Sequence, residues 1–185
     1  MPYRTSLRQG GASAYILANN IGKDGQILFR SPADYQHFMV LVKQLIRSND
    51  SVTLLGFTLL QDSFYLLLRE EHRGAAAKII QRLSIAYGIY FNAKYDKTGK
   101  VFRGPYKDKL LASDDQLIQA LCRAHRLPEL QHESPETYKW SSYHYYLTRR
   151  DTWIDKTFVE KYFATHAYQN DLRHMTSTVP VAREW

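Results

Sequence analysis

Residues 52–60 and 64–69 are two runs rich in apolar and β-branched residues, and only the polar break Gln61-Asp62-Ser63 separates them. Runs of this composition are typical of β-strands, and so short a break is typical of a turn between two strands of one sheet. The pattern therefore predicts a β-hairpin. The remainder of the chain has to be arranged around this antiparallel pair.

The segments that flank the hairpin predict a strand and a helix on each side. The apolar run 13–20 predicts a first strand, and Ser31-Pro32 begins a helical pattern that ends near residue 49. After the hairpin, the spacing of apolar residues predicts a helix over 75–95 and then an extended segment over 101–112. The predicted order is strand, helix, strand, strand, helix, strand. This order is the α+β, ferredoxin-like split βαβ arrangement, an antiparallel sheet with helices on one face.

The chain beyond this core predicts a helical C-terminal part. Ser113-Asp114-Asp115 caps a third helix that stops near Pro128, and the aromatic motif 140–143 predicts a turn or short helix. Residues 157–163 predict another helix, and after about Tyr168 the chain is polar and expected to be loosely held. We divide the chain into a basic N-terminal arm (1–12), one ferredoxin-fold domain (13–148) and a partly helical extension with a polar tail (149–185).

Most of the net charge lies in one segment. The chain carries 25 Lys and Arg against 18 Asp and Glu, a net charge of +7. Between Arg69 and Lys109, ten basic residues stand against four acidic ones, which gives +6, and six aromatic residues are interleaved with them. Cations interleaved with aromatic rings are typical of surfaces that bind phosphates and stack bases. A solvated helix face packed on core aromatics gives the same pattern, so this segment alone leaves both interpretations open.

Several kinds of site and location are disfavoured by the composition. Cys122 is the only cysteine, so no internal disulfide can form and a reduced cytoplasm is expected. No stretch approaches the roughly 18 apolar residues that span a bilayer, and residues 1–11 lack the apolar region of a secretory signal. No two of the seven histidines are two positions apart, as in a His-x-His pair, or four positions apart, as on one face of a helix. We therefore expect no metal and no cofactor.

Five fragments occur in the same order as in one known family. They are Gly10-Gly11, SPADYQHFMVLVKQL from Ser31, GFTLLQDSFYLLLR from Gly56, the run from Ile79 to Leu111 that contains GKVFRG, and YKWSSYHYYL from Tyr138. Together they resemble the REP-associated tyrosine transposases, a branch of the single-tyrosine HUH transposases, over residues 3–147. The most specific parts are the GKVFRG run and the WSSY motif. The resemblance implies DNA as the partner.

The resemblance also implies a reaction whose chemical groups are absent here. In that family a tyrosine attacks a DNA phosphodiester while a divalent metal, held by a His-x-His pair, polarises the phosphate. In this sequence Ser63 and Tyr65 occupy the histidine positions, and Arg123 falls at the tyrosine position. Neither a serine hydroxyl nor a neutral phenol is a good ligand for a divalent metal. We therefore predict a catalytically degenerate relative that is not an enzyme.

The favoured hypothesis is a DNA-binding protein that acts as a regulator or architectural factor in the cytoplasm, associated with the nucleoid. Its partner is DNA, either duplex or a single-stranded hairpin, and the resemblance leaves a homodimer open. The predicted contacts are cations that hold phosphates. They are Arg4 and Arg8 in the arm, followed by Arg69, Arg73, Lys100, Arg103, Lys107, Arg123 and Arg126.

Two alternatives from other classes stay open. An active DNA strand transferase would use Tyr65 or Tyr106 as the nucleophile, with Asp62 helping to hold a metal. A protein or RNA interaction module would use the same sheet face or the aromatic residues of the C-terminal extension. The absence of a tyrosine-linked nucleotide adduct would exclude the transferase. Failure of any nucleic acid to bind at about 50 mM salt would favour the interaction module.

Overall fold

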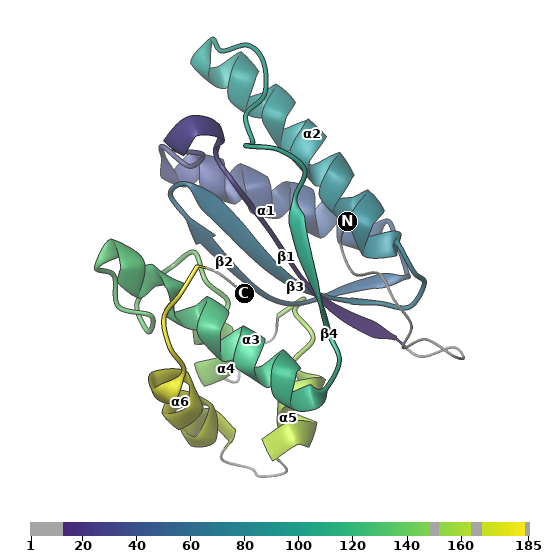
Figure 1. The fold of residues 1–185 in the computed structure, drawn as a ribbon, viewed down its shortest axis with the longest axis vertical. Coiled ribbons are helices and arrows are strands. Elements are labelled where there is room, and N and C mark those ends of the chain that lie inside the picture. The colour runs from purple at the N-terminus through teal and green to yellow at the C-terminus, as the bar shows by residue number, and fades with distance from the viewer. Residues whose placement is uncertain (1–12, 149–151, 164–167, 184–185) are drawn as a thin grey trace.

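The computed structural model describes residues 13–148, 152–163 and 168–183. Its centre is a four-stranded antiparallel sheet with the order β2-β3-β1-β4 (Figure 1). The strands are β1 (Ala14–Ile21), β2 (Val52–Leu60), β3 (Ser63–Glu70) and β4 (Lys107–Leu111). The predicted α+β fold, with its split βαβ order and antiparallel sheet, is confirmed.

Two long helices, α1 (Pro32–Arg47) and α2 (Ala75–Tyr95), cover one face of the sheet (Figure 1). The α2 bounds match those predicted from the apolar spacing. The buried carboxylate of Glu70 fixes the start of this helix, since it accepts hydrogen bonds from the backbone N–H groups of Gly74 at 3.0 Å and Ala76 at 3.1 Å. This cap satisfies donors that the first turn of a helix leaves without partners.

The carboxylate of Asp34 joins the start of α1 to the end of α2. One oxygen accepts the N–H groups of residues 30–31, both at 2.8 Å, and the hydroxyl of Tyr95 at 2.6 Å. The other accepts the hydroxyl of Tyr90 at 2.9 Å and Nζ of Lys94 at 2.6 Å. Burial by itself would raise the pKa of Asp34, but the bonds from Lys94, Tyr95 and Tyr90 hold it well below its usual range. Asp34 is therefore a charged, fully bonded group inside the fold.

The opposite face of the sheet is covered as well, so the prediction of helices on one face only is wrong. This layer consists of α3 (Asp114–Arg126), α4 (Tyr143–Leu147), α5 (Thr157–Phe163) and α6 (Tyr168–Thr178). The strands are apolar on both sides. Leu66 is buried in the cluster that contains α1 and α2, while its neighbour Leu67 is buried in the cluster that contains α3. A strand with two apolar faces is stable only when other elements pack against both faces and exclude water from them.

The segment from residue 168 onward is packed against α3, so the expectation of a loosely held tail is wrong. Leu172 and Val179 are buried in the same cluster as the apolar face of α3. The guanidinium of Arg126 donates to the carbonyl oxygens of Ser177 at 3.0 Å and Val179 at 2.5 Å. A few apolar residues on one side of α6 are enough to fix a segment that is polar on average.

The last strand is shorter than the extended segment predicted over 101–112, since only Lys107–Leu111 pairs with β1 as β4. Phe102 instead makes an isolated bridge with Gly22 and is buried near Phe64 and Tyr87, with ring centroids 5.8 and 6.2 Å away. Two short 3-10 turns complete the described structure, η1 (Lys23–Gly25) and η2 (Leu127–Gln131).

Gly56 lies where β2 passes under α3, beside a register shift in the β2–β3 ladder. A Cβ atom at this position would lie 2.6 Å from Cδ1 of Leu121 and 3.2 Å from Oγ of Ser142. We expect Gly56→Ala to destabilise the protein by about 1–3 kcal/mol, because the buried side chain of Leu121 has to shift in a closely packed layer. Urea unfolding measures this change.

Gly88→Ala is the matched control, because the same substitution there meets no obstacle. A Cβ at Gly88, inside α2, would have Val101 as its nearest neighbour at 3.9 Å. Alanine in a helix interior is expected to stabilise by about 0.5–1 kcal/mol. An unfolding midpoint for Gly56→Ala at or above that of the wild type would contradict the close packing of β2 and α3.

Candidate nucleic-acid interface

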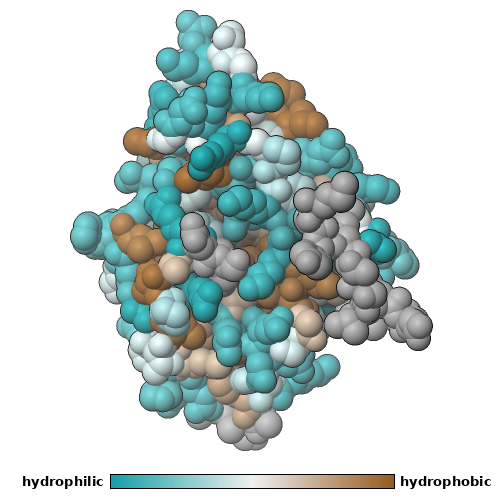
Figure 2. Space-filling view, viewed as in Figure 1, coloured by the Kyte–Doolittle hydropathy of each residue, from teal (hydrophilic) through white to brown (hydrophobic). Residues whose placement is uncertain are grey.

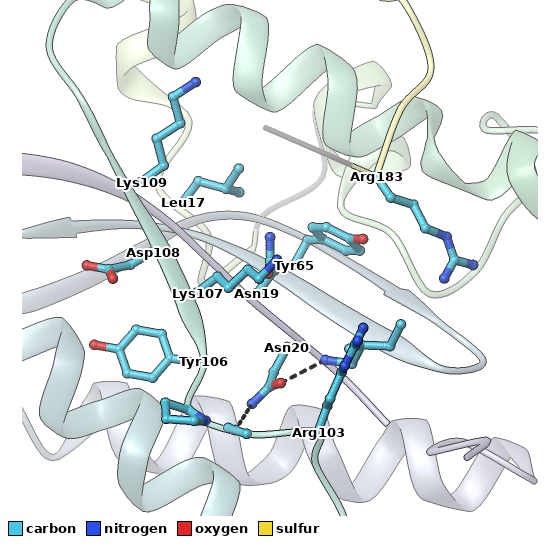
Figure 3. A pocket seen from close by; sticks show the side chains of 13 residues that line it. Leu17, Asn19, Asn20, Tyr65, Arg103, Tyr106, Lys107, Asp108, Lys109 and Arg183 are labelled. Atoms are coloured by element: carbon cyan, nitrogen blue, oxygen red, sulfur yellow. Dashed lines mark hydrogen bonds between the residues drawn. The ribbon is translucent and has the colours of Figure 1, made fainter. Parts of the chain in front are cut away.

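An open groove of about 1050 Å³ follows the sheet edge at β4. Its lining comes from β1, from Tyr65 of β3, from residues 103–106, from β4 and from Arg183 (Figure 3). In the view with β4 in front, hydrophilic side chains predominate on this face of the molecule (Figure 2). The groove therefore joins four distant parts of the chain on a largely polar surface.

The floor of the groove is a row of three side chains across the sheet. Asn19 of β1 pairs in register with Lys107 of β4 on one side and with Tyr65 of β3 on the other. Because neighbouring strands lie about 4.8 Å apart, the row spans about 10 Å. Tyr65 is buried, Asn19 is half-buried and Lys107 is exposed, so the row becomes more accessible toward β4.

Positive charge dominates the lining. Arg103, Lys107, Lys109 and Arg183 stand against the single acid Asp108, so four minus one gives +3. Arg183 is paired with Asp62 at 2.7 Å. Within the described ranges, no acidic partner is found for Arg103, Lys107 or Lys109, and all three are exposed. These three cations are available to an anionic ligand.

Ser63 and Tyr65 lie at the positions where the family resemblance places metal ligands. Ser63 is buried, and its hydroxyl donates to Asp62 at 3.0 Å. Burial raises the pKa of Tyr65, so its phenol is neutral at ordinary pH. In the part of the chain that the structure describes, no three His, Cys, Asp or Glu side chains are placed to hold a metal ion. These side chains do not fit the divalent metal that the resemblance implies.

Arg123 lies on α3, half-buried, and is not part of the groove lining. The helix passes close to the row at this point, since the hydroxyl of Thr58, the register partner of Tyr65, donates to the carbonyl oxygen of Ala124 at 2.8 Å. The helix carrying the expected nucleophile position thus faces the strand carrying the expected ligand positions.

The groove unites two of the predicted DNA contacts, Arg103 and Lys107, and the other predicted contacts among the described residues lie elsewhere. Arg69 is engaged by Glu71 at 3.0 Å and Asp155 at 2.9 Å near the opposite end of β3, about 20 Å along the strand from Ser63. Arg126 is held by Glu129 at 2.6 Å and by the two backbone carbonyls described above.

The remaining predicted contacts are dispersed. Arg73 is exposed in the turn before α2, and Lys100 is exposed in the loop after it. Arg4 and Arg8 lie outside the described residues. Of the seven predicted cations that the structure describes, only Arg103 and Lys107 share one local site.

The sequence reasoning did not propose Asn19, Lys109 or Arg183 as contacts, although all three line the groove. Lys109 was available to that reasoning, since it follows Lys107 by two positions and residues i and i+2 of a strand share a face. Asn19 offered a weaker signal, one of two adjacent amides in a strand that is otherwise mostly apolar. Arg183 offered none, because its place depends on how α6 packs.

His125 provides a test of the packing of α3 over β2. It is fully buried, with Nε2 2.9 Å from Oγ of Ser142. Burial, and to a smaller extent the nearby His144, lowers the pKa of His125 from 6.5 to about 3. The folded state therefore resists protonation, whereas the unfolded chain binds a proton below pH 6.5. Stability is fully present above pH 6.5 and is lost as the pH falls toward 3.

We expect this group to make the protein about 2 kcal/mol less stable at pH 5 than at pH 8. Urea midpoints of the wild type and of His125→Gln at both pH values measure the contribution, and the variant should lose most of the difference. His174→Gln, on an exposed residue of α6, is the control and should keep it. An unchanged pH dependence in His125→Gln would show that another group is responsible.

No protein-family model and no curated protein matches this sequence. A solved structure of a REP-associated tyrosine transposase bound to a REP hairpin aligns with a TM-score of 0.59 over 84% of this chain and 94% of that chain, at 9% sequence identity. The resemblance noted in the sequence is thus confirmed at the level of the fold. Among the described residues, no helix is long and apolar enough to cross a membrane.

Proposed function

We propose that this protein binds DNA through the groove at β4 and does not cut it. The observation that carries the proposal is a set of three exposed cations, Arg103, Lys107 and Lys109, that have no acidic partner in the described part of the chain. They lie on a fold shared with a transposase that was solved with a DNA hairpin. Phosphate contacts made by Arg and Lys supply most of the affinity of proteins for nucleic acids. A groove with a net lining charge of +3 suits such a ligand.

The geometry favours a strand with accessible bases. The floor row is only about 10 Å wide, and it carries an amide and an aromatic ring beside the cations. Tyr65 is buried, so the amide of Asn19 and the cations are the groups that a ligand can reach. The bases of an unpaired strand can bond to an amide through edges that a duplex hides. A hairpin with a single-stranded flank supplies both the unpaired bases and a rigid neighbouring stem.

The proposal that the protein does not cut DNA rests on Ser63 and Tyr65, two residues of β3. Ser63 is bonded to Asp62, and Tyr65 is a buried neutral phenol, so the groups there are neither a pair of imidazoles nor an accessible nucleophile. A protein that holds DNA and leaves it intact can act as a regulator or an architectural factor. We propose that role for this chain.

Fluorescence anisotropy tests the binding. A labelled hairpin with a single-stranded flank, the matching duplex and an RNA of the same sequence are titrated between about 50 and 200 mM salt. We expect the hairpin to bind with an affinity that falls steeply with salt, by about 0.7–0.9 in log–log slope for each phosphate contact. No binding at about 50 mM salt would refute the proposal and favour a protein-interaction module. Tighter binding of the RNA than of the DNA hairpin would identify RNA as the ligand instead.

The lack of cutting has its own test. The same hairpin is incubated with the protein and Mn²⁺, and the products are separated by denaturing electrophoresis and mass spectrometry. We expect intact DNA and no nucleotide linked to tyrosine. A covalent adduct on Tyr65 or Tyr106 would overturn the non-catalytic assignment and establish an active strand transferase.

A further inference from the structure

Asn19 stands at a position where folding alone favours an apolar side chain. It lies in β1, a central strand paired on both sides. Leu17, two residues earlier on the same sheet face, is buried. Asparagine is depleted in strands because its amide competes with the backbone for hydrogen bonds. A polar residue kept in the middle of such a strand calls for a reason outside packing.

The amide of Asn19 has no hydrogen-bond partner among the described residues, unlike that of its neighbour. Asn20 donates to the carbonyl oxygen of Gly104 at 3.1 Å and accepts the N–H of Ile21 at 2.9 Å. Asn20 is therefore used by the fold, whereas the half-buried Asn19 lines the groove with a donor and an acceptor that no described residue engages. The amide of Asn19 is not among the buried polar groups that lack a partner in the described structure, so it is open to solvent and to a ligand in the groove.

The exposed neighbour of Asn19 suits the phosphate of a nucleotide. Lys107 lies beside it in register and offers a cation for a phosphate. The aromatic residue Tyr65 lies on the other side and forms a neutral wall. A carboxamide presents its donor and acceptor side by side, and this arrangement complements N7 and the N6 amino group of adenine in a bidentate contact.

We infer that Asn19 recognises one nucleobase of the bound strand, with a preference for adenine, while Lys107 holds the adjacent phosphate. This inference deepens the proposed DNA binding and rests on it. It assigns a sequence preference to a groove whose cations by themselves would bind any strand.

The probes are fluorescein-labelled 12-nucleotide strands of deoxyadenylate, thymidylate and deoxycytidylate, titrated with the full chain in 100 mM salt. The measured quantity is the ratio of the affinities for the adenine and thymine strands. We expect Asn19→Ala to reduce this ratio by about 5- to 150-fold, with the affinity for the thymine strand nearly unchanged. We expect Lys107→Ala to weaken all three strands by a similar factor.

Gln81→Ala is the matched control, because it removes an exposed carboxamide from α2, in the layer on the other side of the sheet. Its ratio should equal that of the wild type, and urea midpoints verify that each variant is folded. The same ratio in Asn19→Ala and wild type would overturn base recognition while leaving DNA binding intact. A larger loss on the cytosine strand would overturn the adenine assignment, and failure of the wild type to bind any strand or hairpin would overturn the proposed function itself.

Discussion

Replacing Arg103, Lys107 and Lys109 together by alanine is expected to weaken hairpin binding about 100-fold at 0.1 M salt and to lower its salt slope by about 2. Each phosphate held by a cation contributes roughly 0.7 to the log–log slope for a single strand, so three contacts contribute about 2. The effect is large because none of the three cations has an acidic partner among the described residues. Binding of DNA to such a cation does not require the free energy of breaking an ion pair first.

The control for this variant removes the same charge from another surface. Arg47, Lys78 and Arg82 are exposed on α1 and α2, on the other side of the sheet. Replacing these three by alanine lowers the net charge equally but leaves the groove intact. We expect the salt slope to change by less than about 0.5, since only long-range attraction is lost. Equal losses in both triple variants would show that binding follows net charge and not this site.

The second large effect is expected at Asp34. Asp34→Ala removes the acceptor for the backbone donors of residues 30–31, for the hydroxyls of Tyr90 and Tyr95 and for Lys94. We expect a loss of about 3 kcal/mol of unfolding free energy, measured by urea titration at pH 7. The value lies at the low end for a broken buried pair because the side chain of Lys94 is 31% exposed and can return to water.

Two comparisons separate this effect from the mere loss of a carboxylate. Asp50→Ala, on an exposed residue of the turn before β2, should change stability by less than about 0.5 kcal/mol. Because the pKa of Asp34 is lowered from its ordinary value of 3.8, its contribution is present above that pH and lost below it. Wild type and Asp34→Ala should therefore become more alike in stability as the pH falls below about 4. A constant difference would contradict a charged Asp34.

The elements that sequence reasoning placed well are those with local signals. The hairpin has its turn residues between two apolar runs, and α2 has both a helical period and αL residues at its ends, Gly74 and Asp96. Apolar runs alone did not reveal that both sheet faces are covered. An apolar sequence predicts that a residue is buried, but it does not identify the element that buries it. Leu67 packs in the same cluster as residues of α3, which begins about 50 residues later in the sequence, so no local pattern predicts this contact.

The site was predictable only in part, because charge along a chain does not show which cations are paired. Arg69 belongs to the same basic segment as Lys107, yet it meets Asp155, 86 residues later in the sequence. The row of Lys107, Asn19 and Tyr65 depends on strand register, which a shift of one residue would destroy. The assignment of Ser63 and Tyr65 to metal-ligand positions came from the comparison of motifs alone, and it stays a prediction.

The contact between Arg183 and Asp62 joins residues 121 positions apart. The conformational entropy lost in closing so long a loop is larger than the stabilisation from one partly exposed ion pair. The contact therefore has to wait until α6 has docked on α3 and has brought residue 183 near the turn between β2 and β3. One wall of the groove is thus a late product of folding. During synthesis the sheet can assemble first, and the chain acquires the finished groove only when α6 is in place.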